Sequence, residues 1–379
     1  MMTRGLSLYL DAMRFFAALL VLLSHWAYPR FTGGDYIGIR HHDLGGDAVV
    51  AFFVLSGLVV TFSAEKRASD GIRAFAADRL SRLWSVALPA LALTFILDPF
   101  GASLSSEIYP AEYYHGDQPF WRMLTAGTFT NELWFMSVRP GSNGPWWSLG
   151  YEAWFYAIFA CAFFLRGRAQ LIGVALTVLI AGPKVLLLMP SWLMGVWVWR
   201  KISSGTLSNL SKPAALMLTL LPGIVYIAAH LGMIPVKLWL LTRDLVGEDA
   251  IVVLRFSDTF IWSTILGVLV SANILGIAAL VQNNTTIKPI PEKWAQRLRW
   301  LAGGSFALYM VHYPLLQITA AALPGDVHDI KRQLLILVLP LIGAYIFAEL
   351  TERRRAWLRS LLRRVFKADQ VPESLPENS

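Results

Sequence analysis

Residues 6–28 read LSLYLDAMRFFAALLVLLSHWAY, an apolar stretch long enough to cross a bilayer as one helix. It nevertheless carries Asp11 and Arg14 towards one end and His25 towards the other. A helix turns by about 100° per residue, so the eleven residues from Arg14 to His25 place both side chains on one stripe, about 16 Å apart along the axis. Charged groups in hydrocarbon are costly and usually mark a site or a pathway. An interfacial ion pair would explain Asp11 and Arg14, but it would leave His25 unexplained.

The composition is that of a membrane protein. Of the 379 residues, 56% are hydrophobic and only 15% are charged, against about 25% charged residues in soluble domains. The predicted fold class is therefore an all-α integral membrane protein. The net charge of +8 does not indicate a nucleic-acid partner, because basic loops on the cytoplasmic side of a membrane account for it. Cys161 is the single cysteine, so neither a disulfide nor a cysteine metal site is expected.

Apolar runs of membrane length predict about ten transmembrane helices. Their expected ranges are 6–28, 47–64, 83–98, 147–165, 169–182, 185–199, 214–231, 259–281, 301–322 and 333–350. The first is too long for the core of a signal peptide, so we expect it to be retained. The fifth and sixth are separated by Gly182-Pro183-Lys184, which fits either a tight hairpin or a broken, partly re-entrant pair. The longest connection, 99–146, is expected to fold over the outer mouth.

The connections between these runs differ in charge. Arginine and lysine gather in loops 65–82, 166–168, 200–212 and 283–300 and after residue 350, while the intervening loops are mixed or acidic. This alternation predicts that both termini are cytoplasmic, with Arg14 near that side of the membrane and His25 near the other. We expect one transmembrane domain, 1–352, followed by a basic cytoplasmic tail, 353–379, that ends in a disordered segment from Asp369.

Two further motifs lie in the second expected span and at the cytoplasmic start of the third. In Phe52–Gly57, which reads FFVLSG, Ser56 and Gly57 permit close packing of helices, and packing alone would explain the motif. Arg79 and Arg82 are three residues apart, so they share a helix face. Such a pair suits a phosphate group, although arginines are also ordinary on the cytoplasmic side of a membrane protein.

The fourth expected span opens with WSLGYE at 147–152. Ser148 and Glu152 are four residues apart and therefore share a face. Glu152 lies inside the span and should need a partner. We expect His25 to be nearest in depth, so that Glu152 orients it or makes it more basic. An ion pair between Glu152 and Arg14 is not expected.

Further histidines lie along the chain. The ninth expected span holds Tyr309 and His312, three residues apart. A lone histidine inside a membrane helix is more often part of a hydrogen-bonded structure than a catalyst. His115, His230 and His328 lie at outer boundaries of the spans and are expected to be solvated.

Five blocks in this order resemble the membrane acyltransferase-3 family over about residues 7–350. They are Leu10-Asp11 to Arg14 with ten residues to His25, Phe52–Gly57, Arg79-x-x-Arg82, Trp147-Ser148-Leu149 to Glu152, and Ser305–Pro314 with Tyr309 and His312. Each block alone is a modest signal, whereas five in order within a chain of about ten spans are specific.

The resemblance implies an enzyme of the bacterial cytoplasmic (inner) membrane. Members of this family move an acyl group, usually acetyl, from cytoplasmic acyl-CoA to a hydroxyl of a glycan or a related acceptor. The expected partners are acyl-CoA, a cell-surface or lipid-linked glycan and the lipid bilayer, with no bound cofactor. A small hydroxylated acceptor such as a macrolide sugar stays open as the alternative. A proton-coupled transporter is less favoured, because the sequence has no internal repeat and only one Gly/Pro break.

The resemblance also implies roles for single residues. The arginines would hold the CoA phosphates, and His25 would deprotonate the acceptor hydroxyl or briefly carry the acyl group. A tyrosine or histidine of the ninth span would stabilise the oxyanion. The expected catalytic residues are His25, Asp11, Glu152, Tyr309 and His312. The expected donor-binding residues are Arg14, Phe52, Phe53, Ser56, Arg79, Arg82, Trp147 and Ser148, and no metal site is expected.

Overall fold

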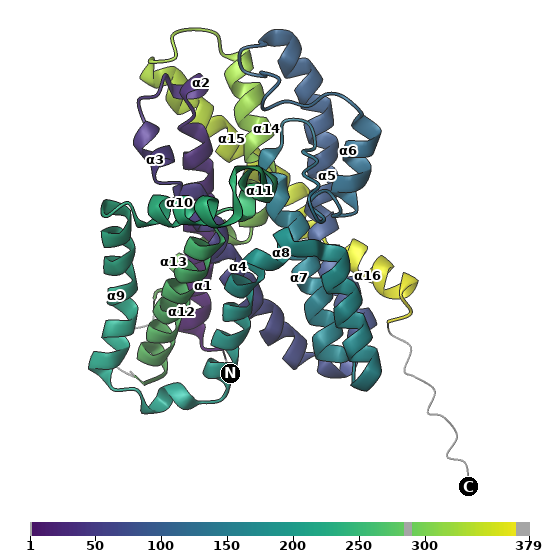
Figure 1. The fold of residues 1–379 in the computed structure, drawn as a ribbon, viewed down its shortest axis with the longest axis vertical. Coiled ribbons are helices and arrows are strands. Elements are labelled where there is room, and N and C mark those ends of the chain that lie inside the picture. Colours follow the sequence, from purple (N-terminus) through teal and green to yellow (C-terminus); the bar gives the residue numbers. More distant parts are fainter. Residues whose placement is uncertain (1, 284–289, 369–379) are drawn as a thin grey trace.

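The computed structural model describes residues 2–283 and 290–368, whose regular structure is helical (Figure 1). Seven of the described helices are long and apolar enough to cross a membrane: α1 (Arg4–Trp26), α4 (Leu44–Lys66), α5 (Gly71–Leu104), α8 (Gly167–Ser203), α9 (Lys212–Leu231), α12 (Phe260–Asn283) and α15 (Ile330–Leu350). Two further helices of 18 residues each are α7 (Trp147–Phe164) and α14 (Ser305–Ala322). The predicted all-α membrane fold is confirmed, while the number of ten spans and the side of the termini stay predictions.

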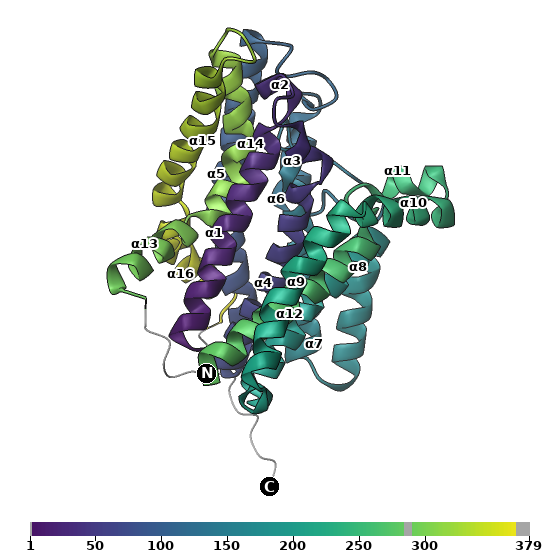
Figure 2. The ribbon, with the colours of Figure 1, turned by 90° about the vertical axis from the view of Figure 1, so that its left-hand side faces the viewer.

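Shorter helices lie around this bundle. They are α2 (Pro29–Thr32), α3 (Ile37–His41), α6 (Pro119–Gly127), α10 (Ile234–Val246), α11 (Glu248–Leu254), α13 (Glu292–Ala302) and α16 (Ala356–Val365). Figure 2 shows α10 and α11 extending sideways from the bundle. The end that carries α2 and α3 is uppermost in Figure 1, so we call it the upper end and the opposite one the lower end. The predicted disordered segment from Asp369 lies outside the described residues.

Helix α8 is interrupted at Gly182, where φ is 77° and ψ is 174°. Glycine adopts such a conformation readily because it has no Cβ, and Pro183 suits the first position of the helix that follows. Before the break, Gln170 bonds with the lower end of α7. Near the end of α8, Trp199 bonds with Glu65 at the lower end of α4. The predicted break is thus confirmed, and the two parts run in opposite directions.

Helices α4 and α8 cross at two glycines. A Cβ on Gly57 would lie 2.0 Å from the carbonyl oxygen of Trp192, and a Cβ on Gly195 would lie 2.0 Å from that of Val54. Small residues allow helix backbones to come this close in a membrane. The packing interpretation of the FFVLSG motif is therefore confirmed for Gly57.

We expect Gly195→Ala to lower the melting temperature of the purified protein, although alanine is the better helix former. The new methyl group meets backbone rather than a movable side chain, so α4 and α8 must separate, and overpacking of this kind costs about 1–3 kcal/mol. The control is Gly223→Ala in α9, because nothing lies within 4 Å of the added Cβ. Alanine there should raise stability by up to about 1 kcal/mol. Equal melting temperatures for the two variants would contradict the close crossing.

Helix α5 extends well beyond the predicted span 83–98 at both ends and contains Pro89 and Pro99. Prolines are tolerated in membrane helices where neighbouring groups satisfy the freed carbonyls. The loop 65–82 is largely helical, and Arg79 and Arg82, for which the spacing predicted a common helix face, both lie within α5. Their side chains are consequently held on defined faces of a helix.

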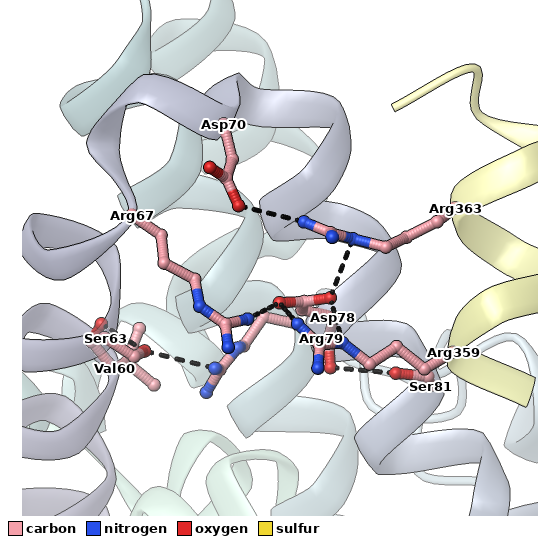
Figure 3. A network of polar contacts seen from close by, with 9 residues as sticks. All are labelled: Val60, Ser63, Arg67, Asp70, Asp78, Arg79, Ser81, Arg359 and Arg363. Atoms are coloured by element: carbon pink, nitrogen blue, oxygen red, sulfur yellow. Dashed lines mark hydrogen bonds and ion pairs between the residues drawn. The ribbon is translucent and has the colours of Figure 1, made fainter. Parts of the chain in front are cut away.

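Two amphipathic helices lie at the lower end of the bundle. α13 occupies the second half of the predicted loop 283–300 and exposes Trp294. α16 packs against α5, where Arg359 forms an ion pair with Asp78 (Figure 3). Helices with apolar and basic faces are typical of the membrane interface. The loop prediction is wrong for 292–300, because the apolar residues of this basic segment recur with the period of a helix.

The connection between α5 and α7 folds over the upper end. Asp98, buried in α5, accepts hydrogen bonds from the backbone N–H and the hydroxyl of Ser142, at 2.6 and 2.7 Å. The Asn143 side-chain amide donates to the carbonyl oxygen of Met310 in α14, at 2.9 Å. These bonds fix the end of the connection between two long helices and thereby position Trp147 at the start of α7.

Candidate functional site

A cavity of about 390 Å³ lies at the upper end, and we call it the upper pocket. It is lined by His25 of α1, Asp47 of α4, Trp147 of α7 and Arg255, which follows α11. The residues around it come from segments far apart in the sequence. The long connections at the upper end bring them together, which the spacing of motifs did not reveal.

The hydrogen bonds of two histidines fix their tautomers. Nδ1 of His312 lies 2.7 Å from the carbonyl oxygen of Tyr309, and Nδ1 of His25 lies 2.9 Å from that of Val21. Carbonyl oxygens only accept, so both Nδ1 atoms carry hydrogen. Nδ1 of His25 also lies 3.1 Å from Nε2 of His312, which accepts in the neutral ring. The free electron pair of His25 is therefore on Nε2, for which the described residues provide no hydrogen bond.

A second cavity of about 60 Å³, the lower pocket, lies between α1, α4, α5, α7 and α14. It gathers most of the predicted donor-binding residues. The predicted site residues in its lining are Arg14, Phe52, Phe53, Ser56, Arg82, Ser148, Glu152 and Tyr309. Trp147 lines the upper pocket instead. Ser148 and Glu152 share the same cavity, so the predicted common face is confirmed.

Tyr309 and Val49 line both pockets and so form the wall between them. The Tyr309 hydroxyl lies 2.6 Å from the Ser148 hydroxyl and donates to the carbonyl oxygen of Pro145 at 3.1 Å. The ring of Phe52 packs 5.9 Å from the Tyr309 ring, centroid to centroid. Both ends of the Tyr309 side chain are therefore held, and the ring stays in the wall.

The structure places Glu152 away from His25. Its carboxylate accepts hydrogen bonds from Ser56, at 2.5 Å, and from the hydroxyl of Tyr156. The prediction that Glu152 orients His25 is wrong, because one turn of α7 carries Glu152 below Tyr309 and into the lower pocket. It shares that pocket with Arg14, although the structure shows no ion pair between those two residues.

Asp11 forms an ion pair with Arg14, with 3.8 Å between Oδ1 and Nη1. Asp11 lines neither the upper nor the lower pocket. The ion pair that was the alternative explanation for these two residues is therefore present. It accounts for Asp11, whereas Arg14 also faces the lower pocket. The stripe predicted on α1 is real, but its two ends reach separate cavities.

Arg79 and Arg82 differ in their surroundings. Arg79 donates to the hydroxyl of Ser63 at 3.1 Å, next to the ion pairs around Asp78 (Figure 3). Arg82 lines the lower pocket, and no hydrogen bond or ion pair engages its guanidinium within the described part of the chain. The predicted clamp of two arginines on one phosphate is therefore not formed in this structure, because only Arg82 faces the cavity.

Glu352 was not singled out from the sequence. Its carboxylate accepts a hydrogen bond from the backbone N–H of Ala307 at 3.0 Å, in the first turn of α14. Acidic groups stabilise the N-termini of helices. Ser305 of the same turn lines the lower pocket, so Glu352 fixes one wall of it. Among the many charges near the end of α15, no sequence pattern distinguished this one.

Asp47 joins three hydrogen-bond donors at the edge of the upper pocket. Its carboxylate accepts from Trp262 at 2.7 Å and from Tyr226 and His230 at 2.9 Å each. His230 is buried, so the prediction that it is solvated is wrong: α9 ends against α4 and α12 rather than in solvent. The sequence held one sign of this cluster, because a carboxylate at the start of an apolar run requires a partner.

We expect Asp47→Leu to destabilise the protein strongly. Trp262, His230 and the half-buried Tyr226 would lose their acceptor, and a hydrogen bond to a charged group contributes about 1.5–3 kcal/mol. Asp244→Leu is the control, since the Asp244 side chain is 66% exposed. Thermal unfolding of both variants is measured by the loss of the folded peak in size-exclusion chromatography. An unchanged melting temperature for Asp47→Leu would show that the cluster does not hold α4, α9 and α12 together.

The upper pocket combines carboxylates with aromatic faces. Burial, and then the charge of Asp47, raise the pKa of Asp43 to about 6. Asp258 accepts from the indole N–H of Trp239 at 2.8 Å. The rings of Trp147 and Phe256 stack at 4.6 Å. Carboxylates accept from hydroxyl groups and aromatic faces cover apolar ones, so the pocket suits a hydroxylated molecule. Among residues 2–283 and 290–368, no group of three or more His, Cys, Asp or Glu could hold a metal ion.

Comparisons with known proteins agree with these features. The sequence matches the acyltransferase domain family, Acyl_transf_3, over residues 7–349. It is similar to an O-acetyl transferase of Shigella phage Sf6, 30% identical over 171 residues, which are 43% of this chain and 48% of the relative. It is also similar to acyltransferase MdmB of Streptomyces mycarofaciens, 28% identical over 155 residues, 40% of this chain and 37% of the relative. No solved structure matches. The chain spans half or less of these relatives, but the family match covers most of it: the protein belongs to the acyltransferase-3 family.

Proposed function

We propose that the protein is an O-acyltransferase of the bacterial inner membrane that moves an acetyl group from cytoplasmic acetyl-CoA to a hydroxyl of a cell-surface or lipid-linked saccharide. The placement of His25 carries this proposal. Its Nδ1 is held by Val21 and His312, which leaves Nε2 unprotonated in a residue that lines the upper pocket. Membership in the acyltransferase-3 family supplies the class of reaction.

The proposed topology has ten spans with both termini in the cytoplasm. The two parts of α8, which the break at Gly182 separates, together with α7 and α14 bring the long helical segments to ten. The lower end, with its basic connections and α16, is then cytoplasmic. The upper pocket opens towards the opposite face, where a surface saccharide would be acylated.

The donor would bind from the lower end. Arg14 and Arg82 line the lower pocket, and arginine is the residue best suited to bind phosphate groups. The CoA phosphates would lie at this end, with the pantetheine arm along Phe52 towards Tyr309.

The chemical step then needs one base. His25 Nε2 accepts the proton of the acceptor hydroxyl while that oxygen attacks the thioester carbonyl. The tetrahedral intermediate collapses, the carbon–sulfur bond breaks, and the proton on His25 is returned to the departing CoA thiolate. Acyl transfer through His25 itself would use the same nitrogen as nucleophile.

His312 and Tyr309 take different parts in this proposal. Both ring nitrogens of His312 are engaged, by Tyr309 and by His25, so His312 is a positioning residue that fixes the tautomer of His25. It has no N–H left for an oxyanion. The Tyr309 hydroxyl lies in the wall between donor and acceptor pockets, and it would stabilise the oxyanion by exchanging its hydrogen bond to Pro145 for one to that oxygen.

The experiment that tests this function uses inverted membrane vesicles with radiolabelled acetyl-CoA. Label in lipid-linked or polymeric glycan, absent from vesicles that lack the protein, supports the proposal. Label that appears only in an added hydroxylated small molecule, such as a macrolide sugar, favours the alternative acceptor class. Label that enters no product, with intact protein and with either acceptor present, would contradict acyl transfer and favour a transporter.

A further inference from the structure

A third cavity of about 130 Å³ adjoins the upper pocket, and we call it the side pocket. Trp147, Arg255 and Phe256 line both cavities. Most of the remaining wall belongs to the connection between α5 and α7. These residues lie between the two cavities, so a molecule in the upper pocket lies beside the side pocket, along the stacked rings of Trp147 and Phe256.

The side pocket is positively charged, in contrast to the upper pocket with its carboxylates. Arg122, Arg139 and Arg255 line it. Among the described residues of its lining, Glu132 is the one acid, and it is already paired with Lys184 at 2.8 Å. Arg122 is likewise paired, with Asp117 at 2.8 Å, and Arg139 donates to the backbone carbonyl oxygens of Glu112 and Tyr113. Arg139 and the exposed Arg255 are therefore the arginines of this lining that have no acidic partner among the described residues. The planar guanidinium of arginine matches a carboxylate or a phosphate.

Arg255 stands at the junction of the two cavities. No hydrogen bond or ion pair of its guanidinium occurs among residues 2–283 and 290–368. Its backbone has φ 49° and ψ −111°, a conformation that side chains other than glycine disfavour. Backbone strain of this kind persists where the surrounding structure imposes it, and it gathers at binding sites.

Asn131 supplies an independent sign of a ligand. Its side chain lines the side pocket and is only 1% exposed. Neither its amide nitrogen nor its amide oxygen has a hydrogen-bond partner in the structure. A buried amide without partners is costly, so a polar group in the cavity would satisfy it, and the Nδ2 donors suit an anion.

We propose that the side pocket binds an anionic group of the acceptor, a carboxylate or a phosphate, while the hydroxyl to be acylated lies beside His25 in the upper pocket. The acceptor is then an acidic saccharide rather than a neutral one. The acylation of this molecule rests on the proposed function, whereas its binding does not.

The test compares matched probes on the full chain in nanodiscs by isothermal titration. p-Nitrophenyl β-D-glucuronide should bind at least about tenfold more tightly than the neutral glucoside, the factor that a single charge-assisted hydrogen bond supplies. Glucose 1-phosphate is the second anionic probe, and the tighter of the two identifies the anion as carboxylate or phosphate.

Arg255→Gly should bring the ratio of the two glycoside affinities close to one. Glycine suits the backbone at this position, so the variant is expected to fold, and Arg255→Lys should restore part of the preference. Lys237→Ala is the matched control, because Lys237 is exposed on α10 and lines neither cavity. If Arg255→Gly does not fold, Arg139→Gln replaces it with the same expected loss.

Equal affinity for charged and neutral probes, no binding of either anion, or a ratio that survives removal of the arginine would each overturn the proposal. The same titration on His25→Ala distinguishes the anion-binding proposal from the proposed function. Selective binding of an anionic probe there, with no acyl transfer by the wild type, would leave the side pocket as an anion site and overturn only the enzymatic step.

Discussion

His25→Ala should lower the rate of acyl transfer by about 10²–10⁴-fold, the contribution expected of a general base. The loss should appear in kcat, because the Arg14 end of the donor site is in another cavity. Radiolabelled acetyl-CoA and membrane vesicles measure it, with size-exclusion chromatography to show that the protein is folded. His328→Ala is the control, since the His328 side chain is 57% exposed.

Wild-type rates in His25→Ala would remove His25 from the mechanism and reduce α1 to a scaffold. Exchange between acetyl-CoA and CoA by the wild type without acceptor, lost in His25→Ala, would show that the imidazole itself carries the acyl group. No exchange by the wild type would instead favour direct transfer with His25 as the base on the acceptor.

The role of His312 has a separate signature. His312→Gln keeps an oxygen that can accept from Nδ1 of His25, whereas His312→Leu does not. We expect the glutamine variant to retain more kcat than the leucine variant, with similar KM values for acetyl-CoA. The pH profile should also change in the leucine variant, because the tautomer of His25 is no longer fixed by its neighbour. Identical kinetics in the two variants would indicate a purely structural role.

Arg82→Ala should raise the KM for acetyl-CoA by about tenfold or more, because a hydrogen bond to a charged group contributes about 1.5–3 kcal/mol. Arg14→Ala should act in the same direction, since both line the lower pocket. Arg79→Ala is the informative comparison: its guanidinium bonds with Ser63 outside this pocket, so its effect on KM should be smaller.

Steady-state kinetics with varied acetyl-CoA and a fixed acceptor measure these effects. An equal rise for Arg79→Ala and Arg82→Ala would restore the two-arginine clamp that the sequence predicted. Unchanged donor dependence in both Arg14→Ala and Arg82→Ala would place the donor elsewhere in the protein.

The sequence predicted well the features that depend on local periodicity. The long helices follow apolar runs, the break at Gly182 follows from glycine and proline chemistry, and Ser148 and Glu152 share a face because they are one turn apart. It failed where distant segments meet. The estimated depth of Glu152 in the membrane predicted His25 as its partner, whereas its hydrogen-bond partners are Ser56 and Tyr156.

Other parts of the site carried no readable pattern. Asp47 and His230 meet although 183 residues separate them in the sequence. The side pocket depends on a connection whose course is set by Asp98 and Asn143 rather than by any repeat. Motif spacing locates residues along one helix, but it does not determine which helices become neighbours.

The tyrosine between the two pockets has a consequence for the cell as well as for catalysis. A protein with cavities reaching in from both ends of the bundle could short-circuit the ion gradient of its membrane. Tyr309, anchored by Ser148 and Pro145 and packed against Phe52, closes that path. In the bacterial inner membrane that we propose for this protein, the closed wall would let the cell keep its proton-motive force while the enzyme waits for both substrates.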